Sequence, residues 1–489
     1  MRALLLLVFS LLSASAAAAG LPQDYPQAKE FFPQATRFGP LEGEPKAAAA
    51  YAGEQLVGYV FLTDDVVRIP AYSGKPINSL VGIDTAGRIT GVAIVEHAEP
   101  ILAVGISEAR LKAFADQYKG KSAFDEVLVG AERPGAVAVD TISGATMTVM
   151  IENATVMRAA RRIAEGRGLG VASGSRIARS EEAPWIAAWH DGRFRVAVLA
   201  FGLAVLTLIL VLQDWLARKP RFLAVLRRCF LLYTIFFIGW YGLAQLSIVH
   251  VITFVHAALR DFRWENFLID PMLFILWSFV AVTLLLWGRG VFCGWLCPFG
   301  ALQELIQEGA QRLKLRQLEF PDVVHERLWA VKYVILLVLF GLSLQSMGDA
   351  VRAAEIEPFK TAITLRFDRE WPFVLYAAGL LAVSAVNRKF YCKYVCPLGA
   401  ALTIPGRFRI FDWWLRRRKE CGRPCQTCAH DCEVRAIRPT GEINANECHY
   451  CLDCQVTYYS DRRCLPLIER RLKREARAAA RVIPIKPAV

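Results

Sequence analysis

Two short motifs with the same spacing carry four of the cysteines. Cys293 and Cys297 stand in Cys-Gly-Trp-Leu-Cys-Pro-Phe-Gly, and Cys392 and Cys396 stand in Cys-Lys-Tyr-Val-Cys-Pro-Leu-Gly. One helical turn would bring both sulfurs of a motif to one face, and the following proline is expected to disturb that helix. Four thiols at two helix ends suit a metal or cluster, or redox disulfides. Cysteine as a small buried apolar residue is the plainer alternative, but the repetition favours chemistry.

A second group of cysteines lies near the C-terminal end, in a predicted ferredoxin-like tail over residues 415–470. Its eight members are Cys421, Cys425, Cys428, Cys432, Cys448, Cys451, Cys454 and Cys464. Thiolates at such short spacing suit two [4Fe–4S] clusters, and bacterial ferredoxins share one cysteine with the opposite cluster. On that pattern Cys464 joins the first three cysteines, and Cys432 joins the other three. The spacing departs from the usual run, since no proline follows Cys432. Paired zinc ribbons are the alternative.

The distribution of cysteine divides the chain in two. All thirteen cysteines lie at or after Cys229, and residues 1–228 contain none. A secreted module held by disulfides would show the opposite pattern. The sequence therefore predicts an exported front joined to a part that stays where thiols are reduced. The net charge of +13 comes largely from basic clusters beside apolar runs, which favours retention at a cytoplasmic membrane face over binding to nucleic acid.

The front of the chain begins like an exported protein. Residues 1–19 combine a basic start, an apolar run and small residues, which is typical of a signal peptide. Residues 50–165 then predict a soluble domain of mixed α/β character, followed by a linker over residues 166–195. The expected strands are Val57–Phe61 and Ile89–Val95, and the expected helices are Glu108–Gln117 and Val149–Ile163.

An α-helical membrane core is predicted over residues 196–400. Hydropathy favours five spans of near the roughly 20 residues that cross a bilayer: Val196–Leu212, Phe230–Ile252, Pro271–Trp287, Leu328–Met347 and Trp371–Val386. Lys332 is expected to snorkel to the interface. Basic residues follow the first span and place this loop inside the cell: Arg218, Lys219, Arg221, Arg227 and Arg228. Five crossings put the tail and both cysteine motifs at the cytoplasmic side of the bacterial inner membrane.

The exported domain contains a candidate site for flavin attachment. Asp140-Thr-Ile-Ser143-Gly144-Ala145-Thr146 resembles the D-x-x-[ST]-G-A-T signature of proteins that carry FMN on threonine through a phosphoester bond. The resemblance implies that Thr146 is the attachment point and that a flavin transferase acts on it. Small neighbours would let an enzyme and a phosphate approach the hydroxyl. A capped start of the following helix is the alternative, because Ser, Thr and Asp favour such positions.

Two further stretches accompany this motif, Gly74-Lys-Pro-Ile77 and the run that holds His97 and Glu99. Together they resemble the FMN-binding domain of the NosR/NirI family, membrane flavo-iron–sulfur proteins of denitrification. The resemblance implies that His97 and Glu99 approach the isoalloxazine ring. A polar strand end explains each of these two residues equally well.

The resemblance to the NosR/NirI family extends along almost the whole chain. It implies a multidomain membrane protein with an exported FMN-binding domain, a five-span core and a tail with two [4Fe–4S] clusters. Family members support a periplasmic reductase: NosR serves nitrous oxide reductase and NirI serves nitrite reductase. The chain is therefore expected to pass electrons from membrane quinol to such a reductase and to be needed for its expression, as an electron-transfer protein rather than a conventional enzyme. Family members usually carry a further exported region before the membrane, where this chain has only residues 166–195.

One alternative function and one assignment of histidines stay open. A redox sensor would use the same flavin and clusters without turnover, although no DNA-binding module is present to act directly on transcription. The sequence contains neither a Walker A motif nor a G-x-G-x-x-G motif, so it does not predict a nucleotide-binding site. His250 and His256 flank the second predicted span and are candidates for a quinol headgroup, with ordinary interfacial histidines as the plainer interpretation.

Overall fold

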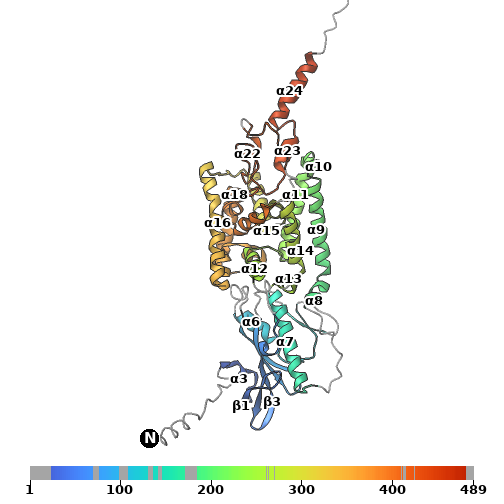
Figure 1. The fold of residues 1–489 in the computed structure, drawn as a ribbon, viewed down its shortest axis with the longest axis vertical. Coiled ribbons are helices and arrows are strands. Elements are labelled where there is room, and N and C mark those ends of the chain that lie inside the picture. The colour runs from blue at the N-terminus through green and yellow to red at the C-terminus, as the bar shows by residue number, and fades with distance from the viewer. Residues whose placement is uncertain are drawn as a thin grey trace, which may run out of the picture. The chain divides into compact units, whose positions relative to one another are not determined.

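The computed structural model describes residues 24–480, apart from a set of short gaps. The gaps are residues 70–75, 98–107, 130–135, 141, 143–145, 171–183, 260–261, 263, 269, 409, 411–414 and 423–424. The predicted signal peptide lies outside the described residues. The chain forms two compact units, residues 1–187 with 263–269 and residues 188–262 with 270–489, and Figure 1 labels their elements.

The first unit is built on an antiparallel sheet in the order β1-β2-β3-β4-β5. Its strands are β1 (Arg37–Glu42), β2 (Ala47–Ala52), β3 (Gln55–Leu62), β4 (Asn78–Asp84) and β5 (Ile89–Glu96), beside a parallel pair of β6 (Val127–Val129) and β7 (Val137–Val139). Its helices are α3 (Gln27–Phe31), α4 (Thr63–Val66), α6 (Glu108–Asp116), α7 (Thr146–Gly166) and α13 (Trp264–Leu268).

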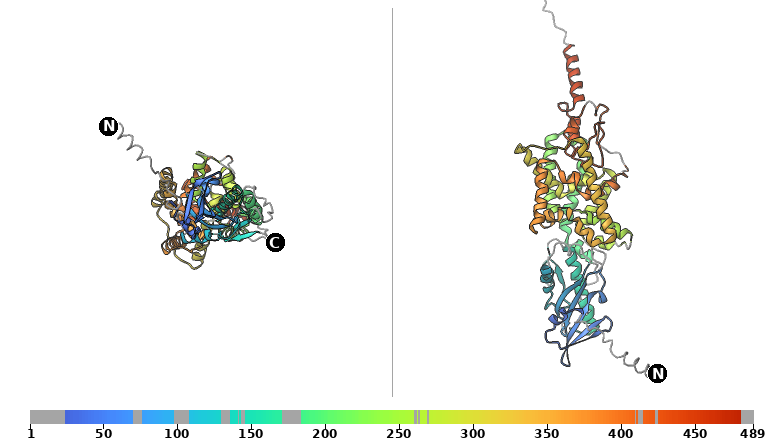
Figure 2. Two further views of the ribbon diagram at one scale, coloured as in Figure 1. Left: turned by 90° about the horizontal axis from the view of Figure 1, so that it is seen from below. Right: turned by 90° about the vertical axis from the view of Figure 1, so that its left-hand side faces the viewer.

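Alternation along the strands gives this sheet two buried faces. Phe61 and Val81 face a core that contains side chains of α6 and α7, whereas Val60 and Leu80 face a smaller core that contains Phe32. Figure 2 shows α7 lying along the strands. The mixed α/β character, both expected strands and both expected helices are confirmed. The sheet begins at β1, earlier than the predicted start at residue 50, because β1 holds a glycine, a proline and two charged residues and shows no regular apolar alternation.

The second unit is helical. Its elements are α9 (Arg193–Val211), α10 (Gln213–Ala217), α11 (Pro220–Tyr233), η1 (Thr234–Tyr241), α12 (Ile248–Leu259), α14 (Pro271–Leu286), η2 (Phe292–Leu296), α15 (Pro298–Arg312), α16 (Asp322–Gln345), α17 (Met347–Ala353), η3 (Ala354–Ile356), η4 (Lys360–Thr364), α18 (Trp371–Val386), α19 (Phe390–Tyr394), α20 (Pro397–Ala401), α21 (Thr403–Gly406), α22 (Thr427–His430), α23 (Asp453–Tyr459) and α24 (Leu465–Ala480). Helix α8 (Pro184–Asp191) precedes them.

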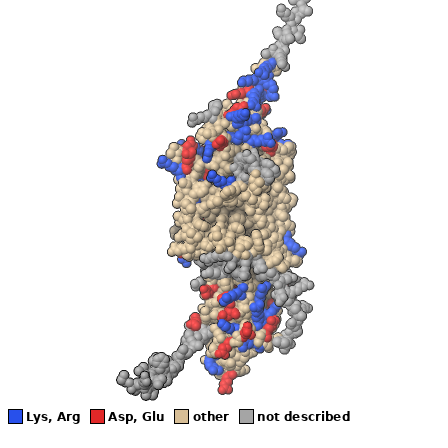
Figure 3. Space-filling view, viewed as in Figure 1, with Lys and Arg blue, Asp and Glu red and all other residues tan. Residues whose placement is uncertain are grey.

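Three helices in the described part of the chain are long and apolar enough to cross a membrane: Arg193–Val211, Pro220–Tyr241 and Asp322–Gln345. Shorter apolar helices are α12, α14 and α18. On the face shown in Figure 3, this unit has a broad zone with few charged side chains, and Lys and Arg gather at the end that carries the tail. These features are those of a membrane protein.

The second predicted span is wrong in its bounds. A continuous helix runs from Pro220 to Tyr241, and α12 begins separately at Ile248. The chain leaves the first helix at Gly242, and Leu243 has a φ of 51°, a conformation that helices do not continue through. Hydropathy alone cannot locate this break because both sides of it are apolar.

Two expectations for basic residues are also wrong. Arg221, Arg227 and Arg228 lie within α11 rather than in a loop. Lys332 does not snorkel to an interface; its side chain is fully buried and pairs with Glu447 of the tail. A buried partner from another segment outweighs the tendency of lysine to reach water.

Candidate functional site

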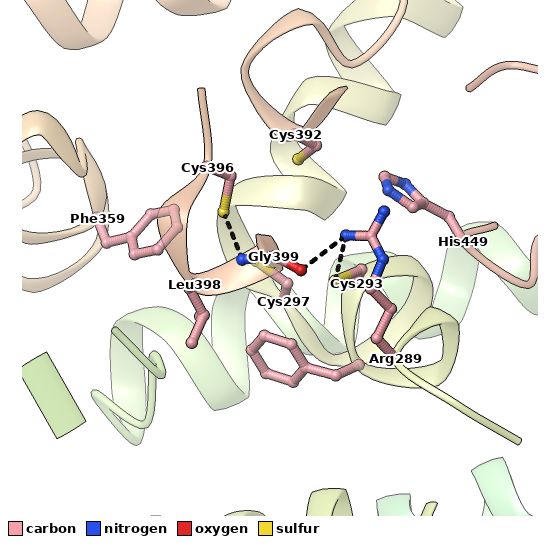
Figure 4. A pocket seen from close by; sticks show the side chains of 10 residues that line it. Arg289, Cys293, Cys297, Phe359, Cys392, Cys396, Leu398, Gly399 and His449 are labelled. Carbon is pink, nitrogen blue, oxygen red and sulfur yellow. Dashed lines mark hydrogen bonds between the residues drawn. The ribbon is translucent and has the colours of Figure 1, made fainter. Parts of the chain in front are cut away.

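The four cysteines of the twin motifs line one cavity. Cys293, Cys297, Cys392 and Cys396 surround it together with Arg289, Phe292, Phe359, Leu398, Gly399 and His449. Figure 4 shows thiols from both motifs around this space, with Arg289 beside Cys293 and the His449 ring beside the Arg289 guanidinium. We call it the core cavity. The structure therefore brings together the two motifs that lie about a hundred residues apart, as the repetition indicated.

Each motif spans a break between two helices: its first cysteine lies in a short helix, η2 or α19, and its second cysteine caps the next helix. Cys297 is the N-cap of α15, where its sulfur accepts the N–H of Gly300 at 3.4 Å. Cys396 is likewise the N-cap of α20, with the Gly399 N–H at 3.2 Å. The proline after each cysteine takes the first helical position, where its missing N–H costs nothing. The short helices η2 and α19 end before these prolines, and Cys297 and Cys396 have extended backbones, so the expected disturbance of the helix at each proline is confirmed.

The surroundings of the four sulfurs fit thiolate ligands of an iron–sulfur cluster. Besides the two glycine N–H donors, Gln303 Nε2 lies 3.0 Å from Cys392 Sγ and Arg289 Nη1 lies 3.9 Å from Cys293 Sγ. Hydrogen bonds to cluster sulfurs and nearby charge set the reduction potential of such centres. None of the thirteen cysteines is in a disulfide. These contacts make the core cavity able to hold a polarisable, negatively charged group.

Buried ion pairs fix the walls of the core cavity. Glu304 of α15 accepts Arg227 Nε at 2.6 Å and Lys389 Nζ at 2.6 Å, and all three side chains are at most 8% exposed. Arg289 donates to the Gly399 carbonyl at 3.2 Å and pairs with Glu447 at 3.2 Å. Since Lys389 precedes the second motif and Glu304 follows the first, these pairs tie the two motifs together.

A second cavity lies in the tail and is lined by five cysteines: Cys428, Cys432, Cys448, Cys451 and Cys454. Four of them are the set that the ferredoxin pattern assigns to one cluster. Cys428, which that pattern assigns to the other cluster, lines the same cavity. Burial raises the pKa of the Cys428, Cys432 and Cys451 thiols, so binding a cluster here would release protons. We call this space the tail cavity.

His449 lines both cavities. Its side chain is 2% exposed, and Nδ1 has no hydrogen-bond partner among the described residues. Burial, together with the nearby Lys389 and Arg289 cations, lowers the pKa of this imidazole well below its usual range, so the ring is neutral. The sequence analysis did not single out His449, although this residue directly follows Cys448, one of the predicted cluster ligands.

Among the described residues, no three His, Cys, Asp or Glu side chains approach closely enough to bind a single metal ion. The four core thiols instead stand around one cavity and five tail thiols around another, whereas Cys421, Cys425 and Cys464 line neither. Gln303 is a further residue that the sequence did not reveal. It is buried in α15 and held by the Ser384 hydroxyl at 2.9 Å.

In the first unit, the candidate flavin residues fall only partly within the described chain. Thr146 is the first residue of α7, Asp140 precedes it with its N–H bonded to Gln117 Oε1 at 2.7 Å, and His97 follows β5. Ser143, Gly144, Ala145 and Glu99 lie outside the described residues. A helix N-terminus at Thr146 suits a phosphate, because free N–H groups and the helix dipole favour an anion there.

Helix α7 also carries a buried carboxyl group, that of Glu152. The Ser79 hydroxyl of β4 donates to Glu152, and burial raises the pKa of Glu152 to about 7. At neutral pH this side chain therefore exists in both its charged and its neutral form. It lies six residues beyond Thr146 on the same helix.

Three protein-family models match separate parts of the chain. The model described as an FMN-binding domain matches residues 72–161. The model described as a 4Fe-4S binding domain matches residues 269–316 and 370–420, which contain the two core motifs. The model described as NosR matches residues 419–475, which contain the tail cysteines. Each group of predicted cofactor residues thus falls within a matched segment.

Two curated relatives match nearly the full chain, and a third matches part of it. Regulatory protein NosR of Pseudomonas aeruginosa is 38% identical over 92% of this chain and 93% of its own. Regulatory protein NosR of Stutzerimonas stutzeri is 36% identical over 99% of this chain and 96% of its own. Protein NirI of Paracoccus denitrificans is 50% identical over 61% of this chain and 44% of its own. The first alignment covers 666 positions against 489 residues here, so that relative carries residues without a counterpart in this chain. The chain belongs to the NosR family.

Proposed function

We propose that this protein transfers electrons across the bacterial inner membrane to a periplasmic reductase of denitrification. The relatives named NosR and NirI, and the FMN-binding and 4Fe-4S-binding segments, support a membrane electron-transfer or regulatory role. The observation that carries the transfer role is that the core and tail cavities share the wall residue His449. Nitrous oxide reductase is the proposed partner, and nitrite reductase is the alternative that the relative NirI suggests.

In this proposal the cofactors divide between the two units. FMN is held covalently on Thr146 after a flavin transferase acts, and the exported unit is periplasmic. Two [4Fe–4S] clusters occupy the cytoplasmic tail, and the four core cysteines hold a further redox centre. A bound iron–sulfur cluster supplies one-electron chemistry. The cysteines would supply the thiolates. Neighbouring residues donate N–H groups to the cysteine sulfurs and exclude water from the cavity.

The bilayer poses a distance problem that the core must solve. Its hydrocarbon layer is about 30 Å thick, and electron tunnelling falls off exponentially with distance. A flavin on one side and clusters on the other therefore need an intermediate. The core thiols shorten the inner part of the gap, and quinol is proposed to serve the outer part beside α12. There His256 Nε2 lies 3.3 Å from Ser343 Oγ, and His250 accepts the Ser247 N–H at 3.0 Å.

The names of the relatives favour a second role. Two of them are called regulatory proteins, so the flavin and clusters would report redox state to a partner without turnover. The two roles differ in whether steady reduction of a periplasmic acceptor requires the core thiols.

We expect loss of the core thiols to block one electron route only. Cys293→Ala combined with Cys396→Ser removes one thiolate from each motif, and serine keeps the helix cap at position 396 because it is a favoured N-cap residue. Flavin reduction by a reduced cytoplasmic donor should fall by about tenfold or more, whereas reduction by quinol should persist. Stopped-flow spectroscopy of reconstituted protein measures both rates. Wild-type rates on both routes would remove the core cysteines from the electron path.

We expect Thr146→Ala to abolish covalent flavin, because the hydroxyl is the proposed phosphoester oxygen. Wild-type protein should keep flavin fluorescence after denaturation and electrophoresis, and this variant should lose it entirely. Thr148→Ala, two residues further along α7, is the matched control and should keep the fluorescence. Fluorescence retained by the Thr146 variant would reject the assignment.

A further inference from the structure

We infer that His449 is the electron bridge between the core and tail centres, a role that rests on the proposed iron–sulfur function of both cavities. The residue is unusual in its position. Its imidazole lines the core cavity, and the same residue lines the tail cavity. Through the backbone it is joined directly to Cys448, a thiol of the tail cavity. A short bonded path therefore runs from a tail ligand to the wall of the core centre.

The imidazole is placed to interact with the core centre. Figure 4 shows its ring pointing into the space between the thiols, beside the Arg289 guanidinium. Its Nδ1 is buried without a hydrogen-bond partner among the described residues. Leaving such an atom unpaired costs free energy, so a partner within the cavity is expected. A thiolate or a cluster sulfur is an acceptor for one N–H of the neutral ring.

The segment around His449 is held against the core by contacts on consecutive residues. Glu447 pairs with Arg289 and Lys332. A Cβ added at Gly290 would lie 2.7 Å from the Cys448 carbonyl oxygen, and one at Gly294 would lie 1.7 Å from that of His449. Trp295 Nε1 donates to the Tyr450 carbonyl at 3.0 Å. Four successive residues of the tail are thus anchored on the segment that carries the first core motif.

This anchoring fixes the geometry that an electron path needs. With clusters bound in both cavities, one electron would pass along this path, so that one centre would be oxidised as the other is reduced. No bond is made or broken and no proton needs to move. The path is the same in the reverse direction. His449 thus provides the path between the two cavities that it lines.

Two variants at this position separate a bridging role from a packing role. His449→Phe keeps an aromatic ring of similar size but removes both ring nitrogens. His449→Gln keeps an N–H donor. After flash reduction of purified full-length protein by a photochemical one-electron donor, rapid freeze-quench EPR follows the tail and core signals. We expect the phenylalanine variant to slow electron exchange between the centres by about tenfold or more, and the glutamine variant to restore most of the rate.

The iron content and the EPR spectra decide between the possible failures. The magnetic interaction between the two reduced centres should weaken in the phenylalanine variant, while the iron content stays at the wild-type level. If exchange and magnetic interaction are both unchanged in that variant, the bridging role is wrong. A separate comparison tests the underlying function: if Cys293→Ala with Cys396→Ser contains as much iron as wild type, the core holds no cluster and the inference fails with it.

Discussion

Replacing Glu304 with glutamine is expected to destabilise the membrane unit by about 3–5 kcal/mol, the range measured when one partner of a buried ion pair is removed. Glu304 is the shared anion of Arg227 and Lys389, and its side chain is 3% exposed. An uncharged amide would leave Arg227 without its ion-pair partner and Lys389 with only Glu433, whose carboxylate oxygen lies 3.7 Å away. Domains are stable by only about 5–15 kcal/mol, so the variant should accumulate poorly and its apparent melting temperature should fall by about 10 °C.

Glu308 provides the matched control for this prediction. It lies four residues further along α15 and pairs with Arg228 at 2.8 Å, but the two side chains are 28% and 45% exposed. Solvent screens such a pair, so Glu308→Gln should change stability by less than about 1 kcal/mol. Differential scanning fluorimetry of detergent-purified protein compares the two variants. Equal melting temperatures for both would show that the Glu304 pairs do not hold the core together.

Replacing Gly294 with alanine is expected to separate the tail from the core. The new Cβ would lie 1.7 Å from the His449 carbonyl oxygen, and because both atoms belong to backbone-fixed positions, no side-chain rotation relieves the clash. Segment 447–450 must move away, and the Trp295 hydrogen bond to Tyr450 must break. Hydrogen–deuterium exchange of this segment should accelerate by about tenfold or more, since a lost contact of about 1.4 kcal/mol already gives that factor.

Gly309 is the control for the glycine substitution. It lies within α15 and a Cβ there would meet nothing within 4 Å. Alanine in a helix is favoured over glycine by about 0.5–1 kcal/mol, so Gly309→Ala should leave exchange in segment 447–450 unchanged and stability equal or slightly higher. Protection of the segment in the Gly294 variant at the wild-type level would contradict the packing described for it.

The sequence predicts what depends on local pattern and misses what depends on partners from distant segments. Strands such as Ile89–Val95 and helices such as Val149–Ile163 carry a clear period and are present as β5 and α7. The pairing of the two cysteine motifs followed from their repetition. The break after Tyr241 could not be predicted, because no polar run marks it.

Buried charge is the other feature that sequence patterns could not reveal. Lys332 and Arg227 stand in or beside apolar runs, where the interface or a loop is the ordinary location for a cation. Their partners, Glu447 and Glu304, are more than seventy residues away in the chain. His449 was overlooked because it stands out only by lining both cavities, which the sequence does not show. That information exists only once the tail is packed on the core.

The attachment of the tail has a consequence for how this protein meets soluble redox partners. A ferredoxin on a flexible tether can diffuse between donor and acceptor, but here Glu447 is fastened to Arg289 and Lys332 inside the core. The tail therefore cannot serve as a shuttle. If the tail accepts electrons as proposed, a soluble donor would travel to the protein and dock on the tail's outer surface, where the Arg416 and Arg470 side chains are exposed. Encounter with an acidic donor should accordingly slow as ionic strength rises.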